Sequence, residues 1–337
     1  MRRTPIPPAR LRLPALACLG AMSLVGCTAS GGTEPAAAAD GELTVLASFY
    51  PLEWLSQQVA GDRATVSSLT PPGAEPHEYE LTPRDVAAVS VADVLVYLPT
   101  LQPSVDDAVD QQAAETAFDA GEHADLDLRY RPGHEDEHAG EHADEHAGDE
   151  HAGEEHAGDE HAEGVTDPHF WHDPMRMAAV GDALAEELGR ADEQHAAEYT
   201  ANAGALRARL EALDAEFRAG LATCASRDVV TSHSAFGYLA DAFDLHQIGI
   251  SGLAPDEEPT PGALTDATAF VRAHGVATIY VETLVSPAVA ETVARETGAQ
   301  TRQLDPIEGL TDDSRGEDYL ELMRANLASL RAGQQCS

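Results

Sequence analysis

A run of histidines and carboxylates between residues 121 and 166 is the part of this sequence that most directly indicates chemistry. It holds eight histidines, the first of them His123, among sixteen carboxylates and two arginines. Imidazole with carboxylate oxygen is a ligand set that suits zinc, copper or nickel. The other seven histidines recur every four or five residues: His134, His138, His142, His146, His151, His156 and His161.

The same tract has too little apolar surface to offset the entropy lost on ordering, so we expect a disordered insert that binds transition metals. The alternative is a solvated acidic spacer, although a spacer needs acid and not regularly spaced imidazole. The whole chain carries a formal charge of −39. Nucleic acid and anionic lipid surfaces are therefore poor partners, and a cation is a good one.

The N-terminus has the organisation of an export signal. Four arginines lie within the first twelve residues, and an apolar stretch runs from Leu13 to Val25, which is too short to cross a bilayer comfortably. This apolar stretch leads into Leu-Val-Gly-Cys at residues 24–27, which resembles the lipobox of bacterial lipoproteins. The resemblance implies cleavage before Cys27 and a lipid on its thiol, anchoring the protein on the outer face of the cytoplasmic membrane. The alternative is an ordinary cleaved signal with a chance cysteine.

Two further cysteines remain once Cys18, inside the signal, and Cys27 are set aside. An even pair in an exported protein suggests a disulfide between Cys224 and Cys336, which would tie the C-terminal helix to the start of the second lobe. Two free thiols, or a thiolate metal site, are the alternatives.

The remaining chain alternates short apolar strands with helical stretches, which favours βα units and parallel sheets. The strands expected are 43–48, 65–69 and 93–98 in the first half, then 228–231, 245–250, 277–281 and 300–304 in the second. The helices expected are 52–60, one that begins at Pro83, 235–242, 260–274, 287–297 and 317–332. Between the halves, a stretch rich in Ala, Glu, Leu and Arg repeats its apolar residues at helical spacing.

These patterns predict an α/β protein of two lobes, each with a central, mostly parallel sheet flanked by helices, joined by one long rigid helix. The predicted organisation is a signal peptide over 1–26, a lipidated tether over 27–42, an N-terminal lobe over 43–190 with the insert 121–166, a linking helix over 191–222 and a C-terminal lobe over 223–337. Ligands of open α/β sheets bind beyond the carboxyl ends of the strands, so we expect a site in a cleft between the lobes.

Four segments place a possible metal ligand in a loop or just after a strand. They are PHEYE at 76–80, DPHFWHDP at 167–174, TSHSAFGY at 231–238 and LDPI at 304–307. The segments FYPLEWLSQQVAG, PHEYELTP, DPHFWHDP, SHSAFGYLA and LDPIEGL resemble, in order and approximate spacing, those of the zinc- and manganese-binding solute receptors of bacterial ABC importers (the cluster A-I type). The resemblance runs from about Leu43 to the C-terminus.

The resemblance implies a metal site made by His77, His169, His233 and Asp305. The manganese branch of the family usually has glutamate where this chain has His233. Three imidazoles and one carboxylate suit zinc, because manganese prefers more oxygen.

Three neighbouring side chains could also take part in this site. Glu78 and His172 could join as ligands, and Glu282, after the strand 277–281, could orient a ligand histidine.

The function expected from these residues is capture of Zn²⁺ in the cleft and delivery to an ABC permease and its ATPase, by a monomeric receptor that is not an enzyme. A zinc hydrolase would need an open coordination position and a nearby general base. The sequence contains no GxSxG, and its HExxH match, HEDEH at 134–138, lies in the tract expected to be disordered and not on an expected helix, as that motif requires. The alternatives are a manganese receptor of the same fold and a zinc-buffering or adhesive surface lipoprotein.

Overall fold

The computed structural model describes residues 43–130 and 164–337 of the 337-residue chain. The predicted signal peptide, the tether with Cys27 and the seven regularly spaced histidines lie outside the described residues. The described residues belong to one compact unit. Within the described ranges, no helix combines the length and the apolar character that crossing a bilayer requires.

The first lobe is built on a four-stranded parallel sheet in the order β2-β1-β3-β4. The strands are β1 (Leu43–Ala47), β2 (Ala64–Ser68), β3 (Val94–Tyr97) and β4 (Ala117–Asp119). The central strands β1 and β3 are apolar on both faces, as expected where helices cover a parallel sheet. The sequence did not predict β4, which is a three-residue edge strand.

The helices of the first lobe are short. They are α1 (Tyr50–Ala60), α2 (Pro83–Val89) and α3 (Pro103–Ala108), of which α3 was not predicted. The predicted start of α2 is confirmed: Thr82 accepts a hydrogen bond from the backbone N–H of Asp85, and the Asp85 carboxylate accepts one from Thr82 N. This capping box fixes where the chain leaves the loop that carries His77.

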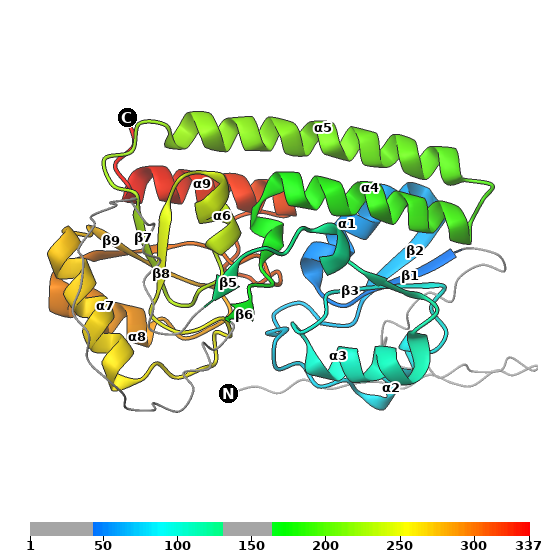
Figure 1. The fold of residues 1–337 in the computed structure, drawn as a ribbon, viewed down its shortest axis with the longest axis horizontal. Coiled ribbons are helices and arrows are strands. Elements are labelled where there is room, and N and C mark those ends of the chain that lie inside the picture. Colours follow the sequence, from blue (N-terminus) through cyan, green and yellow to red (C-terminus); the bar gives the residue numbers. More distant parts are fainter. Residues whose placement is uncertain (1–42, 131–163) are drawn as a thin grey trace, which may run out of the picture. The chain divides into compact units, whose positions relative to one another are not determined.

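The second lobe repeats this topology with the sheet order β10-β9-β7-β8, again all parallel. Its strands are β7 (Asp228–Thr231), β8 (His246–Gly249), β9 (Thr278–Val281) and β10 (Gln300–Gln303). Its helices are α6 (Gly237–Ala242), α7 (Pro261–His274), α8 (Ala288–Thr297) and α9 (Tyr319–Gly333). The predicted fold class, two parallel-sheet lobes flanked by helices, is confirmed (Figure 1).

The predicted long helix between the lobes is the 26-residue α5 (Ala196–Leu221), which follows α4 (Pro174–Ala191). They run side by side and pack on each other (Figure 1). The buried residues of α5 include the predicted apolar stripe of Leu206, Leu210, Leu213 and Phe217. These residues belong to one apolar cluster that also contains core residues of both lobes.

The ends of the predicted insert are ordered, so the prediction of disorder over all of 121–166 was wrong there. Residues 121–123 form a turn of 3₁₀ helix, in which the His123 ring stacks on Phe118 with centroids 5.1 Å apart. Residues on either side of 131–163 then pair as the antiparallel strands β5 (Arg129–Tyr130) and β6 (Val165–Thr166). The residues at both ends of the tract thus make contacts within the folded structure. An argument from the average composition of the whole tract cannot detect such local contacts.

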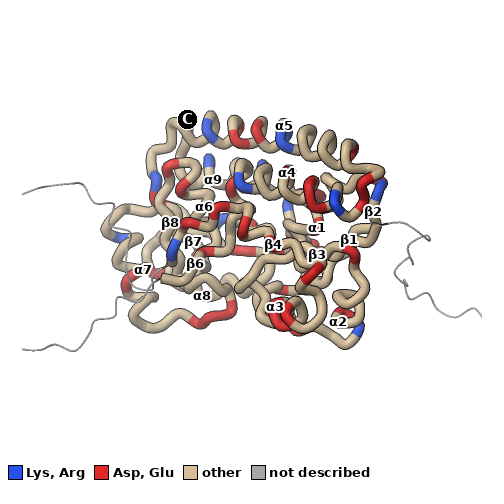
Figure 2. Tube along the Cα trace, turned by 45° about the vertical axis from the view of Figure 1, so that its right-hand side comes forward, with Lys and Arg blue, Asp and Glu red and all other residues tan. Residues whose placement is uncertain are grey.

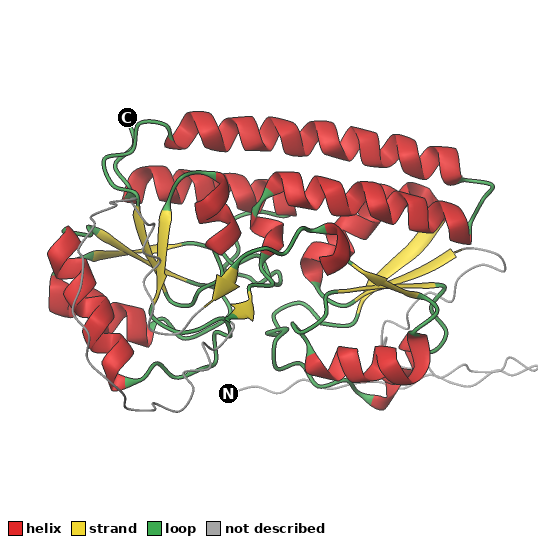
Figure 3. Ribbon diagram, in the orientation of Figure 1, coloured by secondary structure: helices red, strands yellow, loops and turns green. Residues whose placement is uncertain are grey.

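Acidic residues are distributed over both lobes rather than confined to the insert, as Figure 2 shows. The two four-stranded sheets are separate, and each lies beside its own helices (Figure 3).

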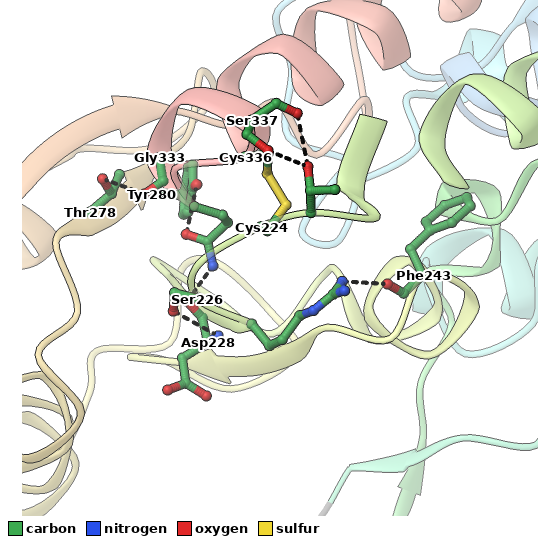
Figure 4. Close-up of a disulfide and its surroundings, with 12 residues drawn as sticks. Cys224, Ser226, Asp228, Phe243, Thr278, Tyr280, Gly333, Cys336 and Ser337 are labelled. Carbon is green, nitrogen blue, oxygen red and sulfur yellow. Dashed lines mark hydrogen bonds between the residues drawn. A yellow bond between two sulfur atoms is a disulfide. The ribbon is translucent and has the colours of Figure 1, made fainter. Parts of the chain in front are cut away.

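The structure contains the predicted disulfide between Cys224 and Cys336 (Figure 4). The buried Gln334 makes a second tie at the same place. Its carbonyl accepts from Ala225 N, and its side-chain amide donates to the Asp228 carbonyl at 2.7 Å. The C-terminus is thus fastened to the N-terminal end of β7.

Candidate metal centre

Three imidazoles and one carboxylate meet in the interior of the molecule. Nε2 atoms of His77, His169 and His233 lie 3.5, 3.5 and 3.4 Å from the same oxygen, Oε1 of Glu308. One potential ligand atom from each residue lies within 4.8 Å of all the others. His169, His233 and Glu308 are buried, and the His77 side chain is 10% exposed.

Each ligand comes from a different connection. His77 lies in the loop between β2 and α2, His169 directly precedes the 3₁₀ turn 170–172, and His233 follows β7. Glu308 follows β10 in the second lobe. His233 and Glu308 both follow strands of the second sheet, and the carboxyl ends of parallel strands lie at one edge of a sheet, which explains why these two residues come together.

Two of the histidines are oriented by buried carboxylates. Asp167 Oδ1 accepts from the backbone N–H of His169 and lies 2.7 Å from its Nδ1. Glu282 does the same for His233, at 3.0 Å from the backbone nitrogen and 2.7 Å from Nδ1. A carboxylate at Nδ1 holds the proton there and leaves the Nε2 lone pair free for a metal, which is how ligand histidines are usually supported.

The charges in this pocket depend on one another. Burial alone would lower the pKa of His233, but the Glu282 and Glu308 carboxylates outweigh it and raise that pKa to about 10. Burial likewise opposes the charged form of His169, and Asp167 and Glu308 raise its pKa. Burial would raise the pKa of Glu308, yet the facing imidazoles hold it well below its usual value. The pocket is therefore an ion-paired cluster that proton loss from imidazole converts into a set of metal donors.

The distances from Glu308 Oε1 to the three Nε2 atoms fit a small tetrahedral ion. Bonds of about 2.0–2.1 Å to nitrogen and oxygen, as zinc makes, give tetrahedron edges of about 3.3–3.4 Å. The three nitrogen-to-oxygen separations are 3.4–3.5 Å. None of the three Nε2 atoms, nor either Glu308 oxygen, has a hydrogen-bond partner among the described residues. Buried polar atoms without partners are costly, and a metal would satisfy them together.

The structure corrects the expected fourth ligand. It brings His77, His169 and His233 together as predicted, but places Glu308, not Asp305, against them. Asp305 is buried and already engaged, since Oδ1 accepts from Ile307 N and Oδ2 from Ser314 Oγ. The segment LDPIEGL contains both carboxylates, so the sequence did hold the signal, but spacing could not show which one faces the imidazoles.

The other neighbours singled out from the sequence are not among these four candidate ligands. Glu78 is exposed. His172 is fully buried, with its ring 4.6 Å from that of Phe236, and burial lowers its pKa to about 3. Glu282 lies beside Nδ1 of His233, the position from which it can orient a ligand histidine.

Comparison with known proteins places the chain. Residues 45–333 match the family "Zinc-uptake complex component A periplasmic" (ZnuA), and the chain belongs to that family. It is 35% identical over 322 residues to the zinc-binding lipoprotein AdcA of Streptococcus pneumoniae serotype 4, covering 94% of this chain but 59% of AdcA. It is 32% identical over 315 residues to the high-affinity zinc uptake system protein ZnuA of Bacillus subtilis, covering 91% and 93%.

Solved structures show the same fold. The laminin-binding protein Lmb of Streptococcus agalactiae, described as an adhesin with metal-transporting activity, matches with a TM-score of 0.71 and 32% identity, over 87% of this chain and 99% of Lmb. The Zn(II)-bound ZnuA-like domain of Streptococcus pneumoniae AdcA matches with a TM-score of 0.67 and 31% identity, over 87% and 99%. This chain thus spans about 59% of the full AdcA lipoprotein and nearly all of its ZnuA-like domain.

Proposed function

We propose that this chain is an extracytoplasmic zinc receptor, which captures Zn²⁺ between its lobes and delivers it to an ABC permease and its ATPase. The observation that carries the proposal is the buried group of His77, His169, His233 and Glu308, at tetrahedral spacing. Membership of the zinc-uptake family and the zinc-bound relative support zinc as the cargo.

The donor set supports binding rather than catalysis. A catalytic zinc site keeps an open coordination position for water or substrate, whereas four protein donors fill a tetrahedral shell. Three imidazoles with one carboxylate also favour zinc over manganese, which is bound more readily by oxygen-rich sites.

Capture is a proton-coupled step in this proposal. Zinc enters where His77 is partly exposed, displaces protons from the imidazoles and is held by residues of both lobes. Delivery reverses this step when the receptor docks on the permease. Because one chain supplies all four donors, we propose that the monomer is the working unit.

Location and the histidine-rich tract complete the proposal. We propose that a lipid on Cys27 anchors the protein on the outer face of the cytoplasmic membrane, in line with the name of the lipoprotein relative. His134, His138, His142, His146, His151, His156 and His161 would act as an accessory, low-affinity zinc store. The tract is not needed for the tight site, because all four donors lie outside it.

The test is a chelator-competition titration of the protein from Thr28, intact and lacking residues 131–163, with manganese as competitor. We expect one tight zinc site in both forms, its loss in His233→Ala and little displacement by manganese. Tight binding that disappears with the tract, while His233→Ala behaves normally, would replace the receptor by a metal-buffering surface protein. For delivery, zinc-limited growth of a deletion strain should be restored by the wild type and not by His233→Ala.

A further inference from the structure

The Glu308 carboxylate has no hydrogen bond that would fix its position among the described residues. Both carboxylate oxygens are buried without a hydrogen-bond partner in the described part of the chain, and the three imidazole Nε2 atoms lie 3.4–3.5 Å from Oε1. Its position is therefore set by the backbone from which it projects. Whatever fixes that backbone also fixes the fourth metal donor.

The backbone just before Glu308 has a conformation that it would not adopt by itself. Ile307 has φ +58°, in the left-handed region, and its side chain is fully buried. A β-branched residue is strongly disfavoured there, because its Cβ crowds the neighbouring carbonyl. Such a conformation persists only where surrounding contacts impose it, and it clusters at functional sites.

Asp305 supplies the contact that imposes it. Oδ1 accepts a hydrogen bond from Ile307 N at 2.9 Å, which closes a tight turn over Pro306, and Oδ2 accepts from Ser314 Oγ at 3.3 Å. Aspartate is suited to this because its carboxylate reaches the backbone N–H two residues on.

The turn is itself anchored on both sides. The buried Asn326 of α9 brackets the Asp305 backbone, accepting from its N–H at 2.8 Å and donating to its carbonyl at 2.7 Å. The Pro306 carbonyl accepts from Trp171 Nε1 at 2.8 Å. Trp171 lies two residues after His169, so the turn that carries Glu308 is hydrogen-bonded to the segment that carries another ligand.

We propose that Asp305 is a positioning residue of the metal site: its carboxylate closes the turn that holds Ile307 left-handed and so presents Glu308 to the three imidazoles. This rests on the proposed function, in that Glu308 is taken as a zinc ligand. It gives the buried Asp305 a role other than that of ligand. The two roles predict opposite results for the Asp305→Asn variant. Asparagine keeps a side-chain oxygen for the Ile307 N–H, but it is a poor replacement for a ligating carboxylate.

The experiment uses the purified receptor with two readouts. The visible spectrum of the Co²⁺-substituted protein reports the number and kind of donors, and zinc affinity is measured by chelator competition. Glu308→Gln supplies the reference for loss of the carboxylate. For Asp305→Ala we expect a Co²⁺ spectrum shifted toward that of Glu308→Gln and zinc affinity lower by about 10- to 100-fold, the usual cost of losing an outer-shell partner. For Asp305→Asn we expect rescue of both spectrum and affinity toward the wild type.

Two further variants keep the test decisive. Asp305→Ser offers a weaker acceptor in the same turn and should fall between asparagine and alanine. If Asp305→Ala is not recovered folded, the asparagine–serine comparison decides, with serine expected to bind zinc more weakly. In the Asp305→Ala background, Ile307→Gly should recover part of the affinity, because glycine adopts positive φ without strain.

The control is Asp318→Ala, a carboxylate of the same segment that caps α9 by accepting from Glu321 N. It should lower stability without moving the Co²⁺ spectrum. The proposal is overturned if Asp305→Ala keeps the wild-type spectrum, if asparagine and serine bind zinc equally, or if Asp305→Asn matches Glu308→Gln, which would make Asp305 a ligand. If Glu308→Gln itself leaves spectrum and affinity unchanged, the proposed zinc site fails instead.

Discussion

Glu308 is the residue that makes three converging imidazoles compatible with a buried, metal-free pocket. Its charge offsets the charge of the imidazoles it faces, and its oxygen is the vertex that completes the tetrahedron. Burying an isolated carboxylate would cost much free energy. The facing imidazoles therefore account for the burial of Glu308.

Replacing this carboxylate tests its role as donor. In Glu308→Gln we expect zinc affinity to fall by at least about 10-fold, since even outer-shell partners of a metal carry that cost. The matched control is Glu78→Gln, an exposed glutamate next to His77 that should leave affinity unchanged. Competition titration decides. Equal affinities in the two variants would show that the fourth donor has been misassigned.

Zinc binding should strengthen as pH rises. The pKa of His233 is raised to about 10 in the metal-free protein, so at neutral pH this ring is protonated and must lose its proton before Nε2 can bind zinc. Affinity is therefore lowest in acid and increases through neutral pH toward about 10. At least one proton should be released per zinc between pH 7 and 9, measurable by calorimetry in buffers of different ionisation enthalpy. An affinity that is constant over this range would contradict the ion-paired pocket.

At this scale the sequence identified three of the four donors and missed the fourth. His77, His169 and His233 were predicted because each lies in a short motif that resembles those of the receptor family in order and spacing. Asp305 and Glu308 lie three residues apart in one segment, and both are carboxylates. Which one reaches the imidazoles depends on the left-handed turn at Ile307, and an isoleucine gives no sequence signal for positive φ.

Among the secondary-structure elements, the 3₁₀ turn 170–172 ties the ligand-bearing segments together. Trp171 Nε1 donates to the Pro306 carbonyl, and the Trp171 carbonyl accepts from Tyr319 Oη at 2.6 Å. The Phe49 ring lies 5.0 Å from the indole, edge to face. One buried residue thus contacts Phe49 and Pro306 through its side chain and Tyr319 through its carbonyl.

Removing the indole N–H should disturb both stability and metal binding. In Trp171→Phe the buried Pro306 carbonyl loses its donor, at a cost of about 1–3 kcal/mol in the free energy of unfolding, and zinc affinity should fall with it. Trp54→Phe is the matched control: Trp54 packs on Tyr319 with centroids 4.6 Å apart, but no hydrogen bond from its indole is found in the described structure. Urea unfolding measures the effect of each variant on stability, and competition titration measures its effect on zinc affinity. If Trp171→Phe keeps wild-type zinc affinity, the turn is not held through Trp171.

The elements that the sequence predicted well are those with strong local patterns. Local sequence patterns predicted the apolar stripe of α5, the helix start at Thr82–Pro83 and the apolar strands of both sheets. The three-residue β4 and the two-residue β5 and β6 were missed because so short a strand is formed by pairing with a neighbour and has no period of its own.

For the molecule as a whole, the lobes share a core through α4, α5 and α9. Leu184 of α4, Leu210 of α5 and Leu322 of α9 belong to the same cluster as Val45 in the first sheet and Val229 in the second. Large rotations of one lobe against the other would expose this apolar surface, which costs about 25 cal/mol per Å². Metal uptake should therefore involve local movement near the ligands more than wide opening of the lobes.

The disulfide should contribute to stability without affecting the metal site. It closes a loop of 112 residues at the N-terminal end of β7, whereas His233 follows the opposite end of that strand. Replacing both Cys224 and Cys336 by serine should cost about 2–4 kcal/mol in the free energy of unfolding and leave zinc affinity unchanged. Urea unfolding with and without reductant measures the first, and competition titration the second. A weakened zinc site in the folded double variant would show coupling along β7 that the structure gives no reason to expect.

The most direct measurement is a crystal structure of the zinc-loaded protein lacking residues 131–163, with anomalous data on both sides of the zinc absorption edge. We predict one strong zinc peak, bonded to the Nε2 atoms of His77, His169 and His233 and to a Glu308 oxygen at about 2.0–2.2 Å. Asp305 would remain hydrogen-bonded to Ile307. A zinc ion ligated by Asp305, or no ordered zinc among these four residues in crystals that hold zinc elsewhere, would contradict the account.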